Sequence, residues 1–273
     1  MDKKKVLIVT QEMEPYTDLS NISEAVRQLA PFVQENNMEI RVLMPRFGTI
    51  NERRHRLHEV VRLSGMNIIV DDDDYPLIIK VASLPEARMQ VYFLDNEDFF
   101  KRKHVFEDGS GQPFEDNADR MAFFCKGVLE TVKKFGWAPD IVHCHGWMTS
   151  LVPLYLRTAY GTEPLFQNAK VVYSVYDSSP YTEQFSNTFT AKASINNLSE
   201  EDLHAYLNGE GVTLDKGAIQ SADAIVKAGT ALHPSVAGML ENLDKPVLDA
   251  ESDEFPASIL EFYQGLLAEE VEK

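Results

Sequence analysis

The sequence predicts an α/β protein with a single Rossmann-like, doubly wound and mainly parallel sheet that carries a hairpin-rich insertion. A buried strand, an amphipathic helix and a second strand are expected in that order over residues 5–10, 22–35 and 39–44. This βαβ order implies parallel strands joined by a right-handed crossover. In addition, 44% of the 273 residues are hydrophobic, which is enough for a substantial core. The three elements and the composition together favour one large α/β domain.

The first half of the chain shows two different patterns. Up to residue 44, short apolar runs predict the two strands, and apolar residues at helical spacing predict the helix between them. From residue 57 to residue 94 the segments become shorter and alternate between apolar and polar, which is typical of hairpins or a sheet edge. We expect strands there at residues 66–70, 77–81 and 90–94, with the acidic run 71–74 as a solvated turn.

The second half returns to alternating helices and strands. A strong helix over residues 117–135 leads into a strand that ends at His143-Cys144-His145-Gly146-Trp147. The polar segment 178–210 predicts only one short helix after Ser199. Further strands are expected at 170–175 and 224–227, and further helices at 148–157, 214–221, 232–243 and 257–270. We therefore expect one domain over residues 1–245 and a C-terminal helix within 246–273 that packs on or beside it.

Charge and cysteine content exclude several classes of function. The chain has 43 acidic and 26 basic residues and a net charge of −17, which opposes both nucleic acid and anionic membrane surfaces. Its apolar amino-terminal run is too short for a signal peptide, and no segment approaches the length of a transmembrane helix. The two cysteines fit reduced, buried thiols. These features predict a cytoplasmic protein without nucleic-acid or membrane partners.

The turn after the strand at 141–145 is the first candidate site. In open α/β sheets, ligands bind where strand ends meet helix starts, which places His145, Gly146 and Trp147 in a favourable position. His143 and His145 share a strand face, as metal ligands can, but no third ligand is recognisable, so buried structural histidines are favoured over a metal. Trp147 could stack on a sugar or simply pack. The sequence has no nucleophile elbow and no dinucleotide fingerprint, so we assign no nucleophile and no cofactor.

The same turn resembles the His-x-His-Asp-Trp motif of bacterial glycogen and starch synthases, which are ADP-glucose-dependent glucan transferases of two-domain GT-B architecture. Further segments resemble that family in the same order along most of residues 5–240. They are Glu12-Met-Glu-Pro15-Tyr16, Met44-Pro-Arg-Phe-Gly48, 95–102, 116–120 with Phe123-Phe124, Leu151-Val-Pro-Leu-Tyr-Leu156, and Leu214-Asp-Lys-Gly-Ala-Ile219 followed by 221–223. The resemblance implies the N-terminal half of a GT-B fold, with Glu12 as a structural or sugar-site residue.

The chain departs from the family motifs at the expected donor site. Where the family has Lys-x-Gly-Gly after the first strand, this chain has Asp18-Leu19-Ser20-Asn21. A negative charge and added side chains there oppose a diphosphate that needs close backbone approach. The family aspartate after the second histidine is Gly146, and the family His-Asn at the next strand end is Tyr176-Asp177. The resemblance therefore predicts impaired donor binding, and we assign no catalytic residue.

Three functions stay open. The favoured one is a glycogen-synthase-like N-terminal domain that does not transfer glucose alone and binds an α-glucan or a protein partner. The second is an active glucosyltransferase half that uses ADP-glucose and is completed by a separate chain with the nucleotide-binding domain, because 273 residues leave no room for a second sheet. The third is a structural or regulatory subunit that forms a homo-oligomer through the face left exposed.

Overall fold

The computed structural model of the protein describes residues 3–176, 189–196, 198–199, 201–206, 214–250 and 255–268. Within them a ten-stranded sheet has the order β10-β9-β8-β7-β1-β2-β6-β5-β3, and β4 pairs with β5 beside this path. Its strands are β1 (Lys5–Thr10), β2 (Glu39–Pro45), β3 (His58–Glu59), β4 (Met66–Val70), β5 (Asp73–Ser83), β6 (Gln90–Asp95), β7 (Ile141–His145), β8 (Lys170–Val175), β9 (Ala224–Lys227) and β10 (Val247–Asp249).

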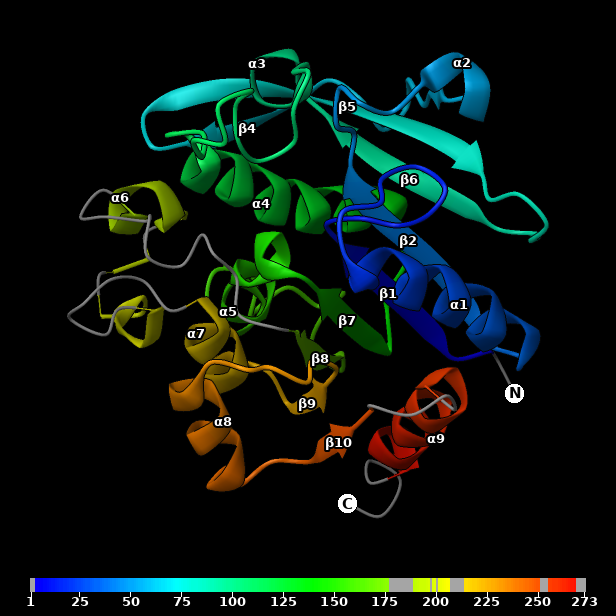
Figure 1. Ribbon diagram of the computed structural model, residues 1–273, viewed down its shortest axis with the longest axis vertical. Coiled ribbons are helices and arrows are strands. Elements are labelled where there is room, and N and C mark those ends of the chain that lie inside the picture. The colour runs from blue at the N-terminus through cyan, green and yellow to red at the C-terminus, as the bar shows by residue number, and fades with distance from the viewer. Residues whose placement is uncertain are drawn as a thin grey trace.

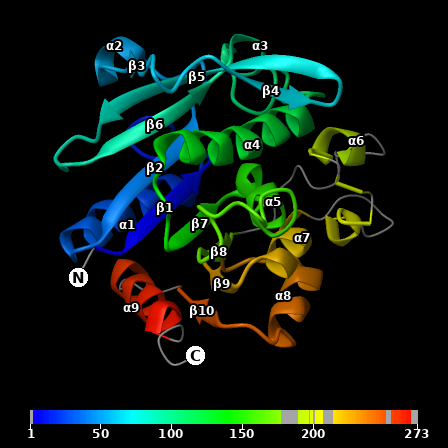
Figure 2. The same cartoon turned by 180° about the vertical axis from the view of Figure 1, so that it is seen from behind.

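Helices cover both faces of this sheet. They are α1 (Asn21–Glu35), α2 (Glu52–His55), α3 (Glu97–Phe100), α4 (Asn117–Phe135), α5 (Leu151–Arg157), α6 (Phe189–Ala193), α7 (Leu214–Ser221), α8 (Pro234–Glu241) and α9 (Phe255–Ala268), with 3₁₀ turns η1 (Trp147–Thr149) and η2 (His204–Tyr206). Helices α1 and α9 pack together on one side, whereas α4, α5 and α7 follow one another on the other side (Figures 1 and 2). The strands from β6 through β2, β1, β7, β8 and β9 to β10 pair in parallel, whereas β5 pairs antiparallel with β3, β4 and β6. The predicted doubly wound, mainly parallel α/β fold is confirmed.

The predicted insertion is smaller than the sequence suggested. Residues 90–94 belong to β6, which forms an antiparallel hairpin with β5 and also pairs in parallel with β2, so this strand is part of the main sheet as well. Strand β5 is longer than expected, and its first residues Asp73 and Asp74 pair with Val70 and Ile69 of β4. The turn is therefore only Asp71 and Asp72. Asp73 and Asp74 can belong to the strand because their carboxylates point to water while their backbone pairs with β4.

Other boundaries in the second half also differ. The helix expected over 148–157 is divided into η1 and α5, and the short helix expected after Ser199 is the single turn η2. Helices α8 and α9 begin and end within two residues of the predicted bounds. Helix α6 and edge strand β10 were not predicted, since five and three residues give too little periodicity to recognise. The earlier part of the polar segment, 178–188, lies outside the described residues.

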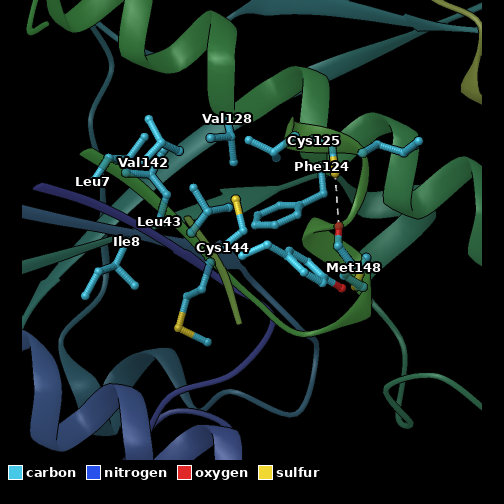
Figure 3. Close-up of a cluster of buried hydrophobic side chains, with 14 of the residues drawn as sticks. Leu7, Ile8, Leu43, Phe124, Cys125, Val128, Val142, Cys144 and Met148 are labelled. Atoms are coloured by element: carbon cyan, nitrogen blue, oxygen red, sulfur yellow. Dashed lines mark hydrogen bonds between the residues drawn. The ribbon is translucent and has the colours of Figure 1, made fainter. Parts of the chain in front are cut away.

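The core lies between the parallel strands and α4. Leu7 of β1, Leu43 of β2 and Val142 of β7 are fully buried beside Phe124 and Val128 of α4 (Figure 3). Continuous apolar strands of this kind are expected in a parallel sheet that is covered on both faces. This packing fixes where each strand ends, and hence where the site residues lie.

Both cysteines belong to this core and are free thiols. The Cys125 Sγ donates to the carbonyl oxygen of Met148 at 3.0 Å (Figure 3). Burial raises the pKa of the Cys125 and Cys144 thiols above the ordinary value. No helix among the described residues is long and apolar enough to cross a membrane.

Candidate functional site at the carboxyl ends of β1, β7 and β8

The turn after β7 is built around Gly146. Its backbone has φ +87° and ψ 160°, a conformation that is essentially restricted to glycine. The carbonyl oxygen of Gly146 accepts hydrogen bonds from the Thr149 backbone N–H at 3.1 Å and from the Thr149 hydroxyl at 2.8 Å, which start the η1 turn. The space beside Gly146 is filled, because a Cβ placed there would lie 2.3 Å from Oε1 of Gln11. The three nearest atoms of residues other than its chain neighbours all belong to Gln11.

Gln11 is held in that space by its own contacts. It is 5% exposed, and its amide Nε2 donates to the Glu12 carboxylate at 3.3 Å. Its Oε1 accepts from the backbone N–H of Met148 at 3.4 Å. An aspartate at position 146 would therefore need both a different backbone path and a different place for Gln11. The structure of the turn thus requires a glycine at position 146.

His143 and His145 are both fully buried on one face of β7. The His143 Nδ1 lies 2.5 Å from the Tyr263 hydroxyl of α9, and its Nε2 lies 2.7 Å from the Ser174 hydroxyl of β8. The His145 Nδ1 lies 2.8 Å from the Tyr176 hydroxyl, and the two imidazole rings are 3.9 Å apart. Both histidines are thus held by hydroxyl groups, in agreement with the buried structural histidines that the sequence favoured.

Burial governs the protonation of this cluster. Burial lowers the pKa of His145 to about 3, and burial followed by the neighbouring His145 lowers the pKa of His143 well below its ordinary value. Burial likewise raises the pKa of the Tyr176 hydroxyl. Both imidazoles are therefore neutral at physiological pH. The Nε2 of His145 is buried and has no hydrogen-bond partner among the described residues.

Trp147 packs against the protein rather than presenting a sugar-stacking surface. Its side chain is 6% exposed, and its ring centroid lies 4.8 Å from that of Phe106. A ring that is covered to this extent offers little face to a sugar. The structure favours the packing role that the sequence left as one of two alternatives.

The loop after β1 forms a helix cap. Ser20 is the N-cap of α1, and its Oγ accepts from the Ile22 backbone N–H at 3.2 Å. The Ser23 hydroxyl donates to Asp18 at 2.7 Å, while Asn21 is the exposed first residue of the helix. Leu19, which lies between Asp18 and Ser20 in the sequence, is 49% exposed. The loop residues thus complete each other's hydrogen bonds.

Glu12 occupies the anion position of this helix start. It is fully buried, and its carboxylate accepts from the backbone N–H groups of Leu19 at 2.6 Å and Ser20 at 3.0 Å. It also accepts from the Ser20 hydroxyl at 2.6 Å. Burial raises the Glu12 pKa, and these hydrogen bonds partly offset that rise. Backbone N–H groups at a helix start are the donors that a phosphate would use, and here an internal carboxylate uses them.

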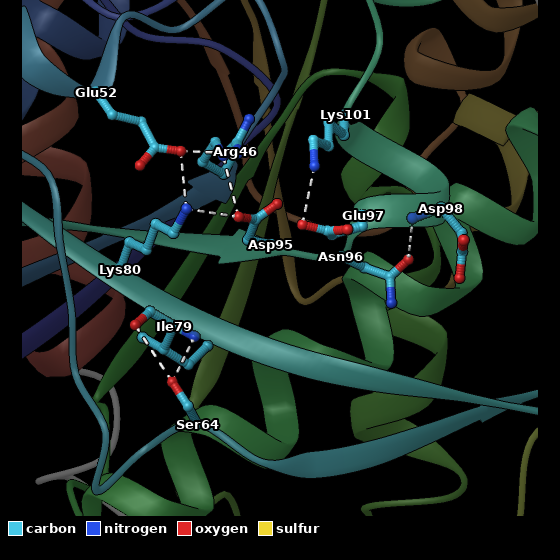
Figure 4. Close-up of polar contacts among 10 residues, drawn as sticks. All are labelled: Arg46, Glu52, Ser64, Ile79, Lys80, Asp95, Asn96, Glu97, Asp98 and Lys101. Carbon is cyan, nitrogen blue, oxygen red and sulfur yellow. Dashed lines mark hydrogen bonds and ion pairs between the residues drawn. The ribbon is translucent and has the colours of Figure 1, made fainter.

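Two cations, Arg46 of the Met44–Gly48 motif and Lys80 of β5, are paired with carboxylates. Arg46 at the end of β2 pairs with Glu52 at 2.7 Å and with Asp95 at 3.0 Å. Lys80 of β5 pairs with the same two carboxylates at 2.8 and 2.9 Å (Figure 4). Burial lowers the Lys80 pKa, but the hydrogen bonds to Glu52 and Asp95 raise it by more. The net result is a raised pKa. These cations hold the β2, β5 and β6 ends together.

The structure brings together only some of the predicted site residues. Ser20 contacts Glu12, and Tyr176 contacts His145, whereas Asp177 lies outside the described residues. The sequence did not reveal Gln11, Ser174 or Tyr263, because a glutamine after a strand and a tyrosine in a tail helix have no signature. No group of three His, Cys, Asp or Glu side chains within the described ranges could hold a metal ion.

The fold and the site define a class of protein: a Rossmann-like, doubly wound α/β domain with a candidate site at the carboxyl ends of its parallel strands. Residues 5–230 match the starch synthase catalytic domain family, and the chain belongs to that family. It is 35% identical over 265 residues, or 96% of its length, to the glycogen synthase of Chlorobaculum tepidum, of which the match covers 52%. It is 41% identical over 174 residues to that of Chlorobium phaeobacteroides, with 63% of this chain and 36% of the relative covered.

A solved structure with the same fold is the catalytic domain of starch synthase IV from Arabidopsis thaliana bound to ADP and acarbose. The two share 19% identity with a TM-score of 0.69, over 96% of this chain and 50% of the plant chain. The matches thus span about half the length of the Chlorobaculum tepidum relative and about a third of the Chlorobium phaeobacteroides relative.

Proposed function

We propose that this chain is a glycogen-synthase-type N-terminal domain that does not bind ADP-glucose or transfer glucose by itself, and that binds an α-glucan or a protein partner. The observation that supports it most is the pair of hydrogen bonds from the Leu19 and Ser20 backbone N–H groups to Glu12. A donor diphosphate at this helix start would compete with that carboxylate and would also meet Asp18. Like charges within a few ångströms in a partly buried site repel strongly.

The turn at Gly146 supports the same proposal. The Gln11 side chain occupies the space that a side chain at position 146 would need. Among the described residues at this end of the sheet, Leu19 is exposed and apolar, and the buried His145 imidazole is neutral. A neutral, partly apolar surface suits a glucan hydroxyl or a protein surface better than a dianion.

Calorimetric titration with ADP-glucose and, separately, with a maltooligosaccharide tests the proposal. We expect glucan binding without donor binding, whereas saturable ADP-glucose binding in the micromolar range would overturn the proposal. Leu19→Ala should weaken glucan binding if this end of the sheet is used. Val247→Ala is the matched control, because Val247 is also an exposed apolar residue but lies on the edge strand β10, at its amino end.

A second candidate is an active half that is completed by a separate chain. The observation behind it is that 96% of this chain matches 52% of the Chlorobaculum tepidum relative. If a partner supplies the missing donor groups, glucose transfer should appear when that partner is mixed with this chain. Light scattering after size exclusion, before and after mixing, separates such a complex from a homo-oligomer of this chain.

A further inference from the structure

A pocket of about 490 Å³ lies at the amino ends of β2 and β6, beside the β5–β6 hairpin. Its volume falls in the range typical of small-molecule sites. The polar side chains that line it are Gln34, Arg41, Ser83, Arg88, Gln90 and Tyr92. None of its lining residues is an aspartate or a glutamate, although the whole chain has 43 acidic and 26 basic residues. The pocket is thus a locally cationic place on an acidic protein.

Arg41 is oriented by aromatic rings; burial lowers its pKa, and the charge of the nearby Glu39 partly opposes that shift. Its guanidinium carbon lies 4.4 Å from the ring centroid of Phe135 and 4.7 Å from that of Trp137. Glu39, two residues earlier on β2, accepts from the Trp137 indole N–H at 2.6 Å. In the described part of the chain, no hydrogen bond or ion pair joins the Arg41 guanidinium to another residue. Stacking fixes its plane and leaves its N–H groups available for a ligand.

Arg88 stands on a hairpin that is tied to α1. The Gln34 Nε2 donates to the Arg88 carbonyl oxygen at 3.0 Å, and the Arg27 guanidinium donates to the Pro85 carbonyl oxygen at 2.9 Å. The Arg88 side chain is exposed, and no described residue pairs with it. The backbone that presents this second guanidinium is therefore held in place while its charge is left uncompensated.

We propose that this pocket binds a small phosphorylated sugar, with its phosphoryl group on Arg41 and Arg88. Guanidinium groups match phosphate oxygens in shape and charge, and an Arg–phosphate contact is among the stronger charge-assisted hydrogen bonds. The hydroxyls of Ser83 and Tyr92 and the amides of Gln34 and Gln90 provide the neutral donors and acceptors that sugar hydroxyls need.

This pocket is separate from the site at the other end of the sheet. The candidate functional site lies at the carboxyl ends of β1, β7 and β8, whereas the pocket touches the amino ends of β2 and β6, which run parallel to them. The proposal therefore does not depend on whether the chain transfers glucose.

Calorimetry with glucose 1-phosphate, inorganic phosphate and glucose tests the assignment. We expect glucose 1-phosphate to bind more tightly than phosphate, and glucose alone to give no saturable heat. Arg88→Ala should weaken the binding of glucose 1-phosphate at least tenfold, as loss of a charged hydrogen bond predicts. Arg53→Ala is the matched control: it removes the same charge from an exposed arginine on α2, outside the pocket, and should leave binding unchanged.

Three results would overturn the proposal. These are glucose 1-phosphate affinity weaker than about 10 mM, an equal loss in Arg53→Ala and Arg88→Ala, and equal affinity for phosphate and glucose 1-phosphate. Repeating the ADP-glucose titration on Arg88→Ala separates the two sites, because donor binding that survives in this variant belongs to the other end of the sheet.

Discussion

The side chain of Gln11 occupies the space beside Gly146, so that a Cβ on Gly146 would lie 2.3 Å from the Gln11 Oε1. The two residues come from the ends of adjacent parallel strands, β1 and β7. Together they form a glycine turn closed by a neutral amide. A side chain at position 146 would therefore need changes at both residues.

Gly146→Asp should lower the free energy of unfolding by about 3 kcal/mol, because strain at φ +87° adds to overlap with Gln11. In a double-mutant cycle with Gln11→Ala, the double variant should lose less stability than the sum of the two single losses, because the overlap is then removed. Urea denaturation of the four proteins measures this coupling. Full additivity would show that Gln11 does not restrict position 146.

Restoring the family loop by Asp18→Lys, Ser20→Gly and Asn21→Gly should destabilise the protein by about 2 kcal/mol, because the α1 cap and the Ser20 contact with Glu12 are lost. ADP-glucose binding should stay absent, since the Gly146 turn is unchanged. Thermal denaturation and calorimetry report the two effects. A triple variant that binds the donor would show that this loop alone had blocked it.

Tyr263→Phe should cost about 1–2 kcal/mol, because it removes the hydroxyl that bonds the buried Nδ1 of His143. Denaturant unfolding measures the loss. Tyr75→Phe is the control, because its hydroxyl bonds none of the described residues, and it should change stability by less than about 0.5 kcal/mol. Equal effects of the two substitutions would mean that the link from α9 to β7 adds no stability.

Stability should fall on acidification below about pH 6.5, since the folded-state pKa of His145 is lowered to about 3 and the unfolded chain takes up protons first. The stability due to the neutral imidazole is complete above the unfolded pKa and is lost as pH falls towards 3. At pH 5 this loss is about 2 kcal/mol. Asp215, with its pKa raised to about 6 by burial, acts with the opposite sign.

His145→Asn should flatten this acid dependence. Melting temperatures of both proteins at pH 5, 6 and 7.5 provide the comparison, in which the difference between wild type and variant isolates His145 from Asp215. The same slope in both proteins would rule out His145 as the group that titrates.

Neither cysteine should react with an aromatic disulfide reagent at pH 8 in the native protein, and both should react after denaturation, because both thiols are buried and their pKa values are raised. The absorbance of the released thiolate counts the reactive groups. Rapid labelling of the native fold would contradict the buried placement of Cys125 and Cys144.

The sheet and most helices could be predicted because their signals are local. Apolar runs such as Val6–Val9 and the helical spacing from Ile22 to Val33 depend only on neighbouring residues. The parallel placement of β6 could not be predicted, since pairing with β2 is decided by a crossover and not by the strand itself. The short α6 and β10 were not predicted, because five and three residues give too little periodicity.

The sequence by itself determined the fold class, the family and the positions at which the family motifs are changed. These follow from patterns of residue types along the chain. Only the tertiary structure showed what replaced the missing groups: Gln11 beside Gly146, Glu12 on the amides of Leu19 and Ser20, and Tyr263 against His143. Such contacts join side chains from different elements, and their existence depends on packing distances of a few ångströms that no linear pattern records.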